Sequence, residues 1–148
     1  MIQELGTRRE LFVDRCLVAR MDGTSLKLHH PVSAGVALWF DEPWARPSAG
    51  YGTVLLDGGQ YRCYYRKTFD VVGSDDSVHQ VTCYAQSDDG ITWHKPSLGL
   101  YEVAGTRDNN VVWAGLGATS HNFAPFVDER PGASSEQRYK ALAGTQTT

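Results

Sequence analysis

The sequence predicts an all-β fold, and two features support this prediction. Glycine occurs 15 times and proline 6 times, so the chain is divided into short segments of the kind that strands and tight turns form. Within several segments, apolar and polar residues alternate with the two-residue period of a strand that is buried on one face. We therefore expect short strands, each about four to eight residues long, rather than long helices.

Four of the segments follow one another closely. We expect strands at residues 52–56, 61–66, 81–87 and 91–93. Asp-Gly-Gly at 57–59 predicts a hairpin turn between the first two, and Asp-Asp-Gly at 88–90 predicts a tight turn before the last. Successive strands joined in this way form an antiparallel meander, and a four-stranded meander is the unit of a propeller blade. One complete blade is therefore expected at about residues 52–93.

The alternation also predicts which side chains share a face. In both central strands, the odd-numbered residues form the more apolar face. These residues are Tyr61, Cys63, Tyr65, Val81, Cys83 and Ala85. Arg62, Tyr64 and Arg66 share the opposite face of the second strand.

The first 40 residues allow two interpretations. Residues 10–14 and 26–29 have the composition of strands, but Val13, Leu17 and Met21 would also share one face of a helix over residues 8–21. Strands are favoured, because the segment contains β-branched residues and lacks a good helix cap.

Further strand candidates follow the meander, at residues 111–113, 123–128 and 138–143. A Pro-Gly-Ala-Ser-Ser sequence at 131–135 separates the last two, and this strand–turn–strand order repeats the opening of the first blade. We therefore interpret residues 1–148 as the N-terminal part of a propeller, with a second blade that begins at about residue 121 and is unfinished at residue 148. Its remaining blades would then be partners of this chain.

Charge and composition exclude several classes of function. The net charge is −3 and the basic residues are scattered, whereas nucleic-acid-binding proteins concentrate basic charge on one face. No apolar run approaches the ~20 residues of a membrane-spanning helix. We therefore expect neither a nucleic-acid nor a membrane partner. The N-terminus lacks the features of a secretory signal, which predicts a cytoplasmic protein if that end is native.

The cysteines do not suggest a metal site. Cys16, Cys63 and Cys83 are odd in number and lack CxxC spacing, so we expect neither a disulfide framework nor bound zinc. They are interpreted as buried free thiols. No metal or other cofactor is predicted.

The most specific local motif is Ser-x-Asp-Gly-x-x-Trp at residues 87–93. The side chain of Asp89 can accept hydrogen bonds from the amides of its own turn, and Gly90 can adopt the left-handed backbone conformation. We expect a structural turn with Trp93 largely buried. The motif resembles the hairpin between outer strands in the blades of five-bladed glycosidase propellers.

The resemblance to glycoside hydrolase families 32 and 43 covers nearly the whole chain. The segments that carry it, in order, are residues 10–14, 40–44, 57–66, 95–100, 108–113 and 121–128. Together they are similar to the N-terminal domain of family 32 glycosidases. The resemblance implies a five-bladed β-propeller that acts on the glycosidic bonds of oligo- or polysaccharides.

The resemblance also implies where the carboxylates of such an enzyme would lie, one in each of the first three blades. The first would lie near residues 48–51, which contain no acid; Asp41 and Glu42 could reach this place only if their loop folds back. The second maps onto residues 121–123, where Asn122 replaces the acid. The third lies beyond residue 148.

The candidate site residues each have a simpler interpretation. Asp41 and Glu42 are candidate catalytic acids beside a sugar-stacking Trp44, or part of a polar loop with a packed tryptophan. Asp108 is a candidate sugar-binding residue, or a turn residue. His121 and Asn122 are candidate substrate-binding residues, or a buried hydrogen-bonded pair.

Two functions remain open from the sequence. The first is a glycoside hydrolase or related carbohydrate-active enzyme, and the second is a non-catalytic propeller that binds sugar or supports assembly. In both cases an unfinished propeller exposes an apolar face. We therefore expect the 148-residue chain to associate and to have no glycosidase activity by itself.

Overall fold

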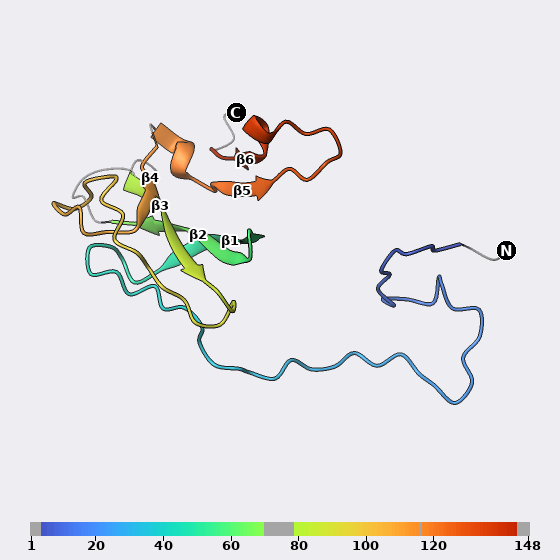
Figure 1. Ribbon diagram of the computed structural model, residues 1–148. Helices are drawn as coiled ribbons and strands as arrows, with labels where there is room; N and C mark the ends of the chain where they lie inside the picture. The colour runs from blue at the N-terminus through green and yellow to red at the C-terminus, as the bar shows by residue number, and fades with distance from the viewer. Residues whose placement is uncertain (1–3, 70–78, 116, 145–148) are drawn as a thin grey trace. The chain divides into compact units, whose positions relative to one another are not determined.

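The computed structural model describes residues 4–69, 79–115 and 117–144 (Figure 1). The chain forms two units, Met1–Gly35 and Val36–Thr148. In the described part of the first unit there is neither a helix nor a strand, so both interpretations of the first 40 residues are wrong. Leu11 and Val13 are each 82% exposed. A strand needs a partner for its backbone groups and a short helix needs a buried apolar face, and this segment has neither.

The second unit contains a four-stranded antiparallel sheet in the order β1-β2-β3-β4 (Figure 1). Its strands are β1 (Ala49–Asp57), β2 (Gln60–Thr68), β3 (Gln80–Ser87) and β4 (Val111–Trp113). The all-β class is confirmed, as are the first three strands of the predicted meander. The hairpin turn between β1 and β2 is also confirmed: Gly58 and Gly59 have φ angles of 60° and 82°, which favour glycine.

The predicted fourth strand at residues 91–93 is wrong. The Asp89 carboxylate accepts hydrogen bonds from the backbone amides of Ile91 and Thr92, at 2.8 and 2.7 Å, so neither amide pairs with β3. After this turn the chain makes one isolated bridge to β3, between His94 and Gln86. It then leaves the sheet and returns as β4, which pairs with β3 instead.

The Asp89 turn itself is confirmed as a structural element. Ser87 Oγ also donates to Asp89 Oδ1, at 2.9 Å, and Gly90 has φ 73°. The backbone bonds from Thr92 and Ile91 hold the pKa of Asp89 well below its usual value. Trp93 is partly rather than largely buried, and it packs against the core.

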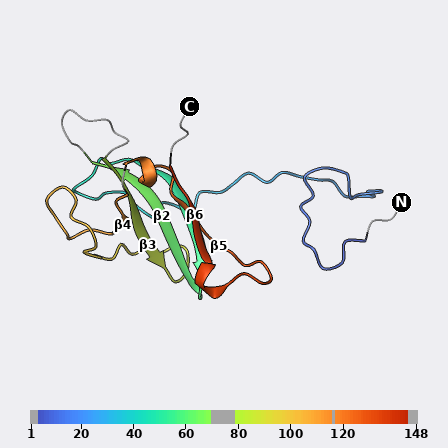
Figure 2. The ribbon, with the colours of Figure 1, turned by 90° about the horizontal axis from the view of Figure 1, so that it is seen from above.

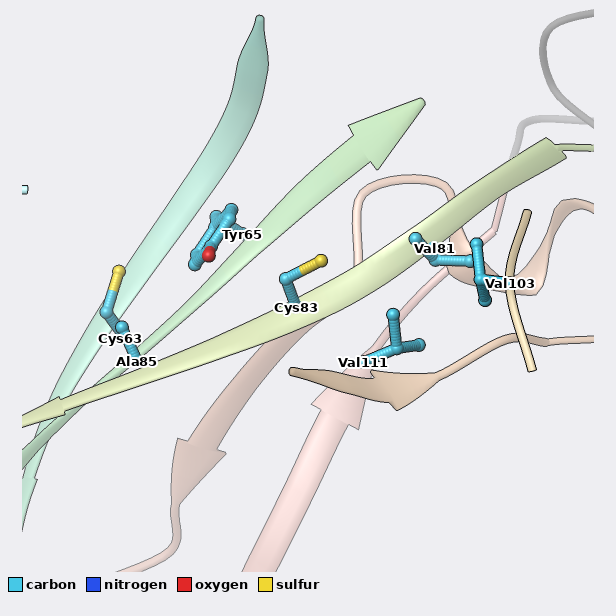
Figure 3. Close-up of a cluster of buried hydrophobic side chains, with 7 residues drawn as sticks. All are labelled: Cys63, Tyr65, Val81, Cys83, Ala85, Val103 and Val111. Atoms are coloured by element: carbon cyan, nitrogen blue, oxygen red, sulfur yellow. The ribbon is translucent and has the colours of Figure 1, made fainter. Parts of the chain in front are cut away.

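The core lies on the odd-numbered face of β2 and β3 (Figure 3). The buried side chains are Cys63, Tyr65, Val81, Cys83, Ala85, Val103 and Val111. The predicted two-residue alternation is therefore confirmed: the odd-numbered positions 63, 65 and 67 of β2 are buried, and the even-numbered positions between them are partly exposed. Burying an apolar side chain of this size contributes about 1.5–3 kcal/mol, so this face dominates the stability of the sheet.

Segments outside the sheet cover this core. The partly buried residues packed against it include Leu38, Phe40 and Trp44, which precede β1, and Trp93 and Tyr101, which lie between β3 and β4. The excursion that displaces the fourth strand therefore supplies part of the core.

A second, two-stranded sheet pairs β5 (Ala124–Val127) with β6 (Tyr139–Leu142). Short 3-10 helices precede its strands, η2 (Gly117–Ser120) and η3 (Ser135–Gln137). The predicted strand–turn–strand order is confirmed, and β5 lies beside β1 (Figure 2). Arg138 and Tyr139 bind the Asp57 carboxylate, at 2.7 and 2.8 Å, which joins the two sheets.

Within the described residues, all three cysteines are free thiols. Cys63 and Cys83 are buried as expected, whereas Cys16 is exposed. No helix in this part of the chain is long and apolar enough to cross a membrane.

Candidate functional site

The segment that precedes β1 folds back over β2. The backbone amide of Arg46 donates to Thr68 O at 2.9 Å. The Lys67 ammonium donates to the carbonyl oxygens of Phe40, at 3.1 Å, and Arg46, at 2.6 Å. The Phe40 and Tyr65 rings lie 4.7 Å apart. Residues 40–46 are therefore attached to the odd-numbered face of β2, which brings Asp41 and Glu42 to the sheet.

Glu42 is the centre of the resulting polar network. The residue is only 7% exposed. Its carboxylate accepts a hydrogen bond from the Tyr65 hydroxyl at 2.5 Å and forms ion pairs with Lys67, at 3.0 Å, and Lys95, at 3.3 Å. Lys67 is fully buried. A buried carboxylate needs such partners, because an uncompensated charge in the interior is strongly unfavourable.

The network continues from Tyr65 to the segment that precedes β4. Asn110 Nδ2 donates to the Tyr65 hydroxyl oxygen and to Tyr84 O, both at 2.7 Å. Asn109 is also buried, and its amide nitrogen donates to Tyr101 O and Thr106 O, both at 2.9 Å. Both asparagine side chains therefore hold the chain in place beside Glu42.

The network keeps the acidic groups ionised. Burial by itself raises the pKa of Glu42, but the Tyr65 hydrogen bond and the Lys67 ammonium outweigh this effect and lower it. Asp41 also pairs with Lys95, and the hydrogen bond from that lysine lowers the pKa of Asp41. Burial, followed by the bond to Glu42, raises the pKa of the Tyr65 hydroxyl. Tyr65 is thus a fixed hydrogen-bond donor and Glu42 a fixed anion.

A pocket of about 210 Å³ lies beside this network. We call it the Glu42 pocket, and it is lined by Asp41, Glu42, Pro43, Trp44, Lys95, Pro96, Ser97, Asp108, Asn109 and Asn110. Four of the six residues predicted from the sequence are therefore brought together: Asp41, Glu42, Trp44 and Asp108. The Asp41 side chain is 71% exposed and Asp108 is exposed as well, so both reach the pocket opening.

The other two predicted residues lie in a different cluster, on the even-numbered face of the sheet. His121 Nδ1 is 2.9 Å from Arg66 Nη1, and the same Nη1 donates to Asn122 Oδ1 at 3.3 Å. The Arg66 guanidinium also lies over the Tyr51 ring, 4.4 Å from its centroid. His121 and Asn122 therefore lie together through their shared contact with Arg66, and neither lines the Glu42 pocket.

Sequence reasoning missed the cations and the hydroxyl of the site. Lys67 lies two positions after Tyr65, but the predicted strand ends at residue 66, so Lys67 is not assigned to a face. Extending the alternation by one residue places Lys67 on the face of Tyr65, and a buried lysine is a signal that a carboxylate partner is near. Lys95 begins one of the segments that carry the family resemblance, but nothing local to it indicates that it reaches Asp41 and Glu42.

The site has no features of a metal centre in the part of the chain that the structure describes, where no three His, Cys, Asp or Glu side chains gather closely enough to hold an ion. The residues that line the pocket include carboxylate acceptors, the hydroxyl of Ser97 and the indole of Trp44. This arrangement suits a neutral, hydroxyl-rich ligand.

Comparison with known proteins finds no matching family model, no matching curated protein and no matching solved structure.

Proposed function

We propose that the chain is part of a carbohydrate-active protein built on a five-bladed β-propeller of the glycosidase type, and that the Glu42 pocket binds a sugar. The antiparallel order β1-β2-β3-β4, followed by the β5-β6 pair, supports the interpretation as one blade and the start of another. Under this interpretation the remaining blades complete the ring against the exposed strands.

The observation that carries the functional proposal is the set of groups at the pocket opening. Each sugar hydroxyl both donates and accepts hydrogen bonds, and one face of a sugar ring is apolar. The exposed Asp41 and Asp108 carboxylates accept, and the hydroxyl of Ser97, an exposed residue that also lines the pocket, can donate. Trp44 is partly buried against the core, so its ring is held rigidly where it lines the pocket, as an apolar platform requires.

Whether a bound sugar is hydrolysed depends on the protonation states of the carboxyl groups at the site. Glycoside hydrolysis uses one ionised carboxylate as nucleophile or base and one protonated carboxylic acid. The lowered pKa of Asp41 suits the first role. Glu42 also has a lowered pKa and is occupied by Tyr65, Lys67 and Lys95, so it cannot supply the acid. Hydrolysis would therefore need an acid from outside these two residues.

This observation also favours the second candidate function, a propeller that binds sugar without cleaving it. In that case Asp41 serves only as a hydrogen-bond acceptor. The two candidates share the pocket and differ in turnover, so one set of variants tests both.

The test combines binding and activity. Binding of fructan and arabinan oligosaccharides is measured by calorimetry, and hydrolysis with chromogenic fructan and arabinan substrates. We expect Trp44→Ala and Asp41→Asn each to weaken binding about tenfold, the equivalent of one good hydrogen bond or stacking contact. Matched controls are Trp39→Ala, an exposed tryptophan of the same segment that does not line the pocket, and Asp88→Asn, an exposed acid of the Asp89 turn.

The outcomes separate the possibilities. Hydrolysis that Asp41→Asn abolishes supports the enzyme, and binding without hydrolysis supports the sugar-binding protein. Equal affinities in Trp44→Ala and Trp39→Ala would show that the Glu42 pocket is not the binding site.

A further inference from the structure

A second cluster of polar and aromatic side chains lies on the face of the sheet opposite the Glu42 pocket, around Arg66. Its members are Tyr51, Arg66, Gln80, His121 and Asn122. Two of them, Tyr51 and Asn122, have φ angles of 52° and 55°. Residues other than glycine adopt this left-handed conformation at a cost that is smaller for asparagine than for tyrosine, and such residues cluster at functional sites.

The backbone of β1 explains how Tyr51 is aimed. The register between β1 and β2 shifts between Gly50 and Thr53, which is a β-bulge. A bulge redirects a side chain out of the regular alternation of the strand. Here it leaves the Tyr51 ring stacked on the guanidinium of Arg66, 4.4 Å from ring centroid to Cζ. Tyr51 is nevertheless 58% exposed, so the stacked pair is open to solvent.

Arg66 differs from its neighbouring cations in lacking a negative partner. Arg62, on the same face of β2, pairs with Asp57 at 3.6 Å, and Lys67 pairs with Glu42 at 3.0 Å. Among the residues that the structure describes, no carboxylate lies within ion-pair distance of Arg66. Within that part of the chain, the Arg66 guanidinium contacts the side chains of His121 and Asn122.

The hydrogen bonds of Arg66 are also incomplete. His121 Nδ1 lies 2.9 Å from Arg66 Nη1 and 2.7 Å from Gln80 Oε1. A neutral imidazole nitrogen either carries a hydrogen or offers one lone pair. When Nδ1 donates to the Gln80 oxygen, it cannot accept from Arg66, and only Asn122 Oδ1 remains, at 3.3 Å. A guanidinium has five N–H donors, so most of them have no acceptor among the residues that the structure describes.

Gly50 lies beside the guanidinium. It faces Arg66 across the strands, and a Cβ at this position would lie 3.5 Å from Arg66 Nη2, in van der Waals contact. Because glycine has no side chain, no Cβ covers this part of the guanidinium. A planar guanidinium with an open edge binds a carboxylate through two parallel hydrogen bonds.

We propose that Arg66, stacked on Tyr51, is an anion-binding site that recognises the carboxylate of an acidic sugar, a uronate. The identification of the anion as part of a sugar rests on the proposed function, whereas the anion site itself rests on the geometry around Arg66. His121 and Asn122 are then positioning residues that hold the guanidinium.

The experiment compares galacturonate, galactose, acetate and inorganic phosphate as ligands of the full chain, by calorimetry and by NMR titration. The variants are Arg66→Gln, which removes the charge, and Arg66→Lys, which keeps the charge but not the two-pronged geometry. Arg62→Gln is the matched control on the same face of the same strand. Circular dichroism establishes that each variant is folded.

We expect galacturonate to bind more tightly than galactose, and the difference to shrink as salt is added. Arg66→Gln should abolish this difference in affinity, and Arg62→Gln should leave it unchanged. Arg66→Lys should reduce the difference about tenfold, which corresponds to the loss of one charge-assisted hydrogen bond. Galacturonate bound equally well by the wild type and Arg66→Lys would overturn the bidentate site. Acetate or phosphate bound as tightly as galacturonate would overturn the assignment to a sugar.

The result also distinguishes this inference from the proposed function. Suppose that galactose binds, that Trp44→Ala weakens its binding, and that Arg66→Gln has no effect on galacturonate. The Glu42 pocket then stands and the anion site is wrong. If only galacturonate binds, with dependence on Arg66 but not on Trp44, the anion site stands and the pocket proposal fails.

Discussion

Replacing Lys67 with methionine should destabilise the fold severely, because this lysine is fully buried and bound on several sides. Its ammonium pairs with Glu42 at 3.0 Å and donates to the carbonyl oxygens of Phe40 and Arg46 at 3.1 and 2.6 Å. Methionine has a similar volume, so packing changes little and the electrostatic loss dominates. Lys67→Met thus isolates the charge of this side chain.

The magnitude follows from what the substitution leaves behind. Removing one partner of a buried ion pair costs about 3–5 kcal/mol, because the other charge stays buried. Glu42 keeps the Tyr65 hydroxyl and Lys95, which favours the lower end, about 3 kcal/mol. A domain has a total stability of only about 5–15 kcal/mol, so the variant should lose a large share of its stability and unfold at a clearly lower urea concentration than the wild type.

The measurement is equilibrium unfolding in urea, followed by tryptophan fluorescence over a range of protein concentrations so that association is detected. Lys27→Met, at an exposed position, is the control and should change stability by less than about 0.5 kcal/mol. The double variant Lys67→Met/Glu42→Gln should lose less than the sum of its two single variants, because it leaves no unpaired charge. Unfolding of Lys67→Met at the wild-type midpoint would refute the buried network.

Two further predictions concern titratable groups. The pKa of Glu42 is lowered in the fold. Its contribution to stability is therefore complete above the pKa of an unfolded glutamate, about 4.3, and is lost as the pH falls through the folded pKa. Acid unfolding of Glu42→Gln should depend less on pH than that of the wild type. Cys16 is exposed, while burial raises the pKa of Cys63 to about 11 and also raises that of Cys83. A thiol reagent should modify Cys16 at once and the other two only on unfolding, and rapid modification of Cys63 in the native protein would contradict the core shown here.

Local patterns predicted the strands of the two sheets, but they also predicted strands that do not form and could not identify every partner. In β2 and β3, every second side chain lies on the same face of the sheet. The apolar residues at these positions therefore indicate the buried face. The prediction of a fourth strand at residues 91–93 was wrong because the motif at residues 87–93 has two structural effects. Asp89 forms the expected turn, but by binding the amides of Ile91 and Thr92 it also prevents the next residues from pairing with β3.

The site shows the same division between local and distant information. The sequence grouped Asp41, Glu42 and Trp44 because they are adjacent, and the resemblance added Asp108. It could not place Lys67 beside Glu42, 25 positions apart in the sequence, because this contact depends on how residues 36–48 fold over β2. The strand prediction for the first 35 residues was wrong for a related reason, since their strand-like segments have no partner strand in the described part of that unit.

The alternation of β2 also explains why adjacent cations have different roles. Lys67 and Arg66 are neighbours in the chain, so their side chains lie on opposite faces of the sheet. Lys67 meets Glu42 and is neutralised inside the core, where a cation without a partner would not be tolerated. Arg66 lies on a partly exposed face, where it contacts His121, Asn122 and the Tyr51 ring. Among the described residues, Arg66 has no carboxylate partner, and a ligand can neutralise such a cation. Charge balance, rather than residue type, therefore separates the structural cation from the candidate binding cation.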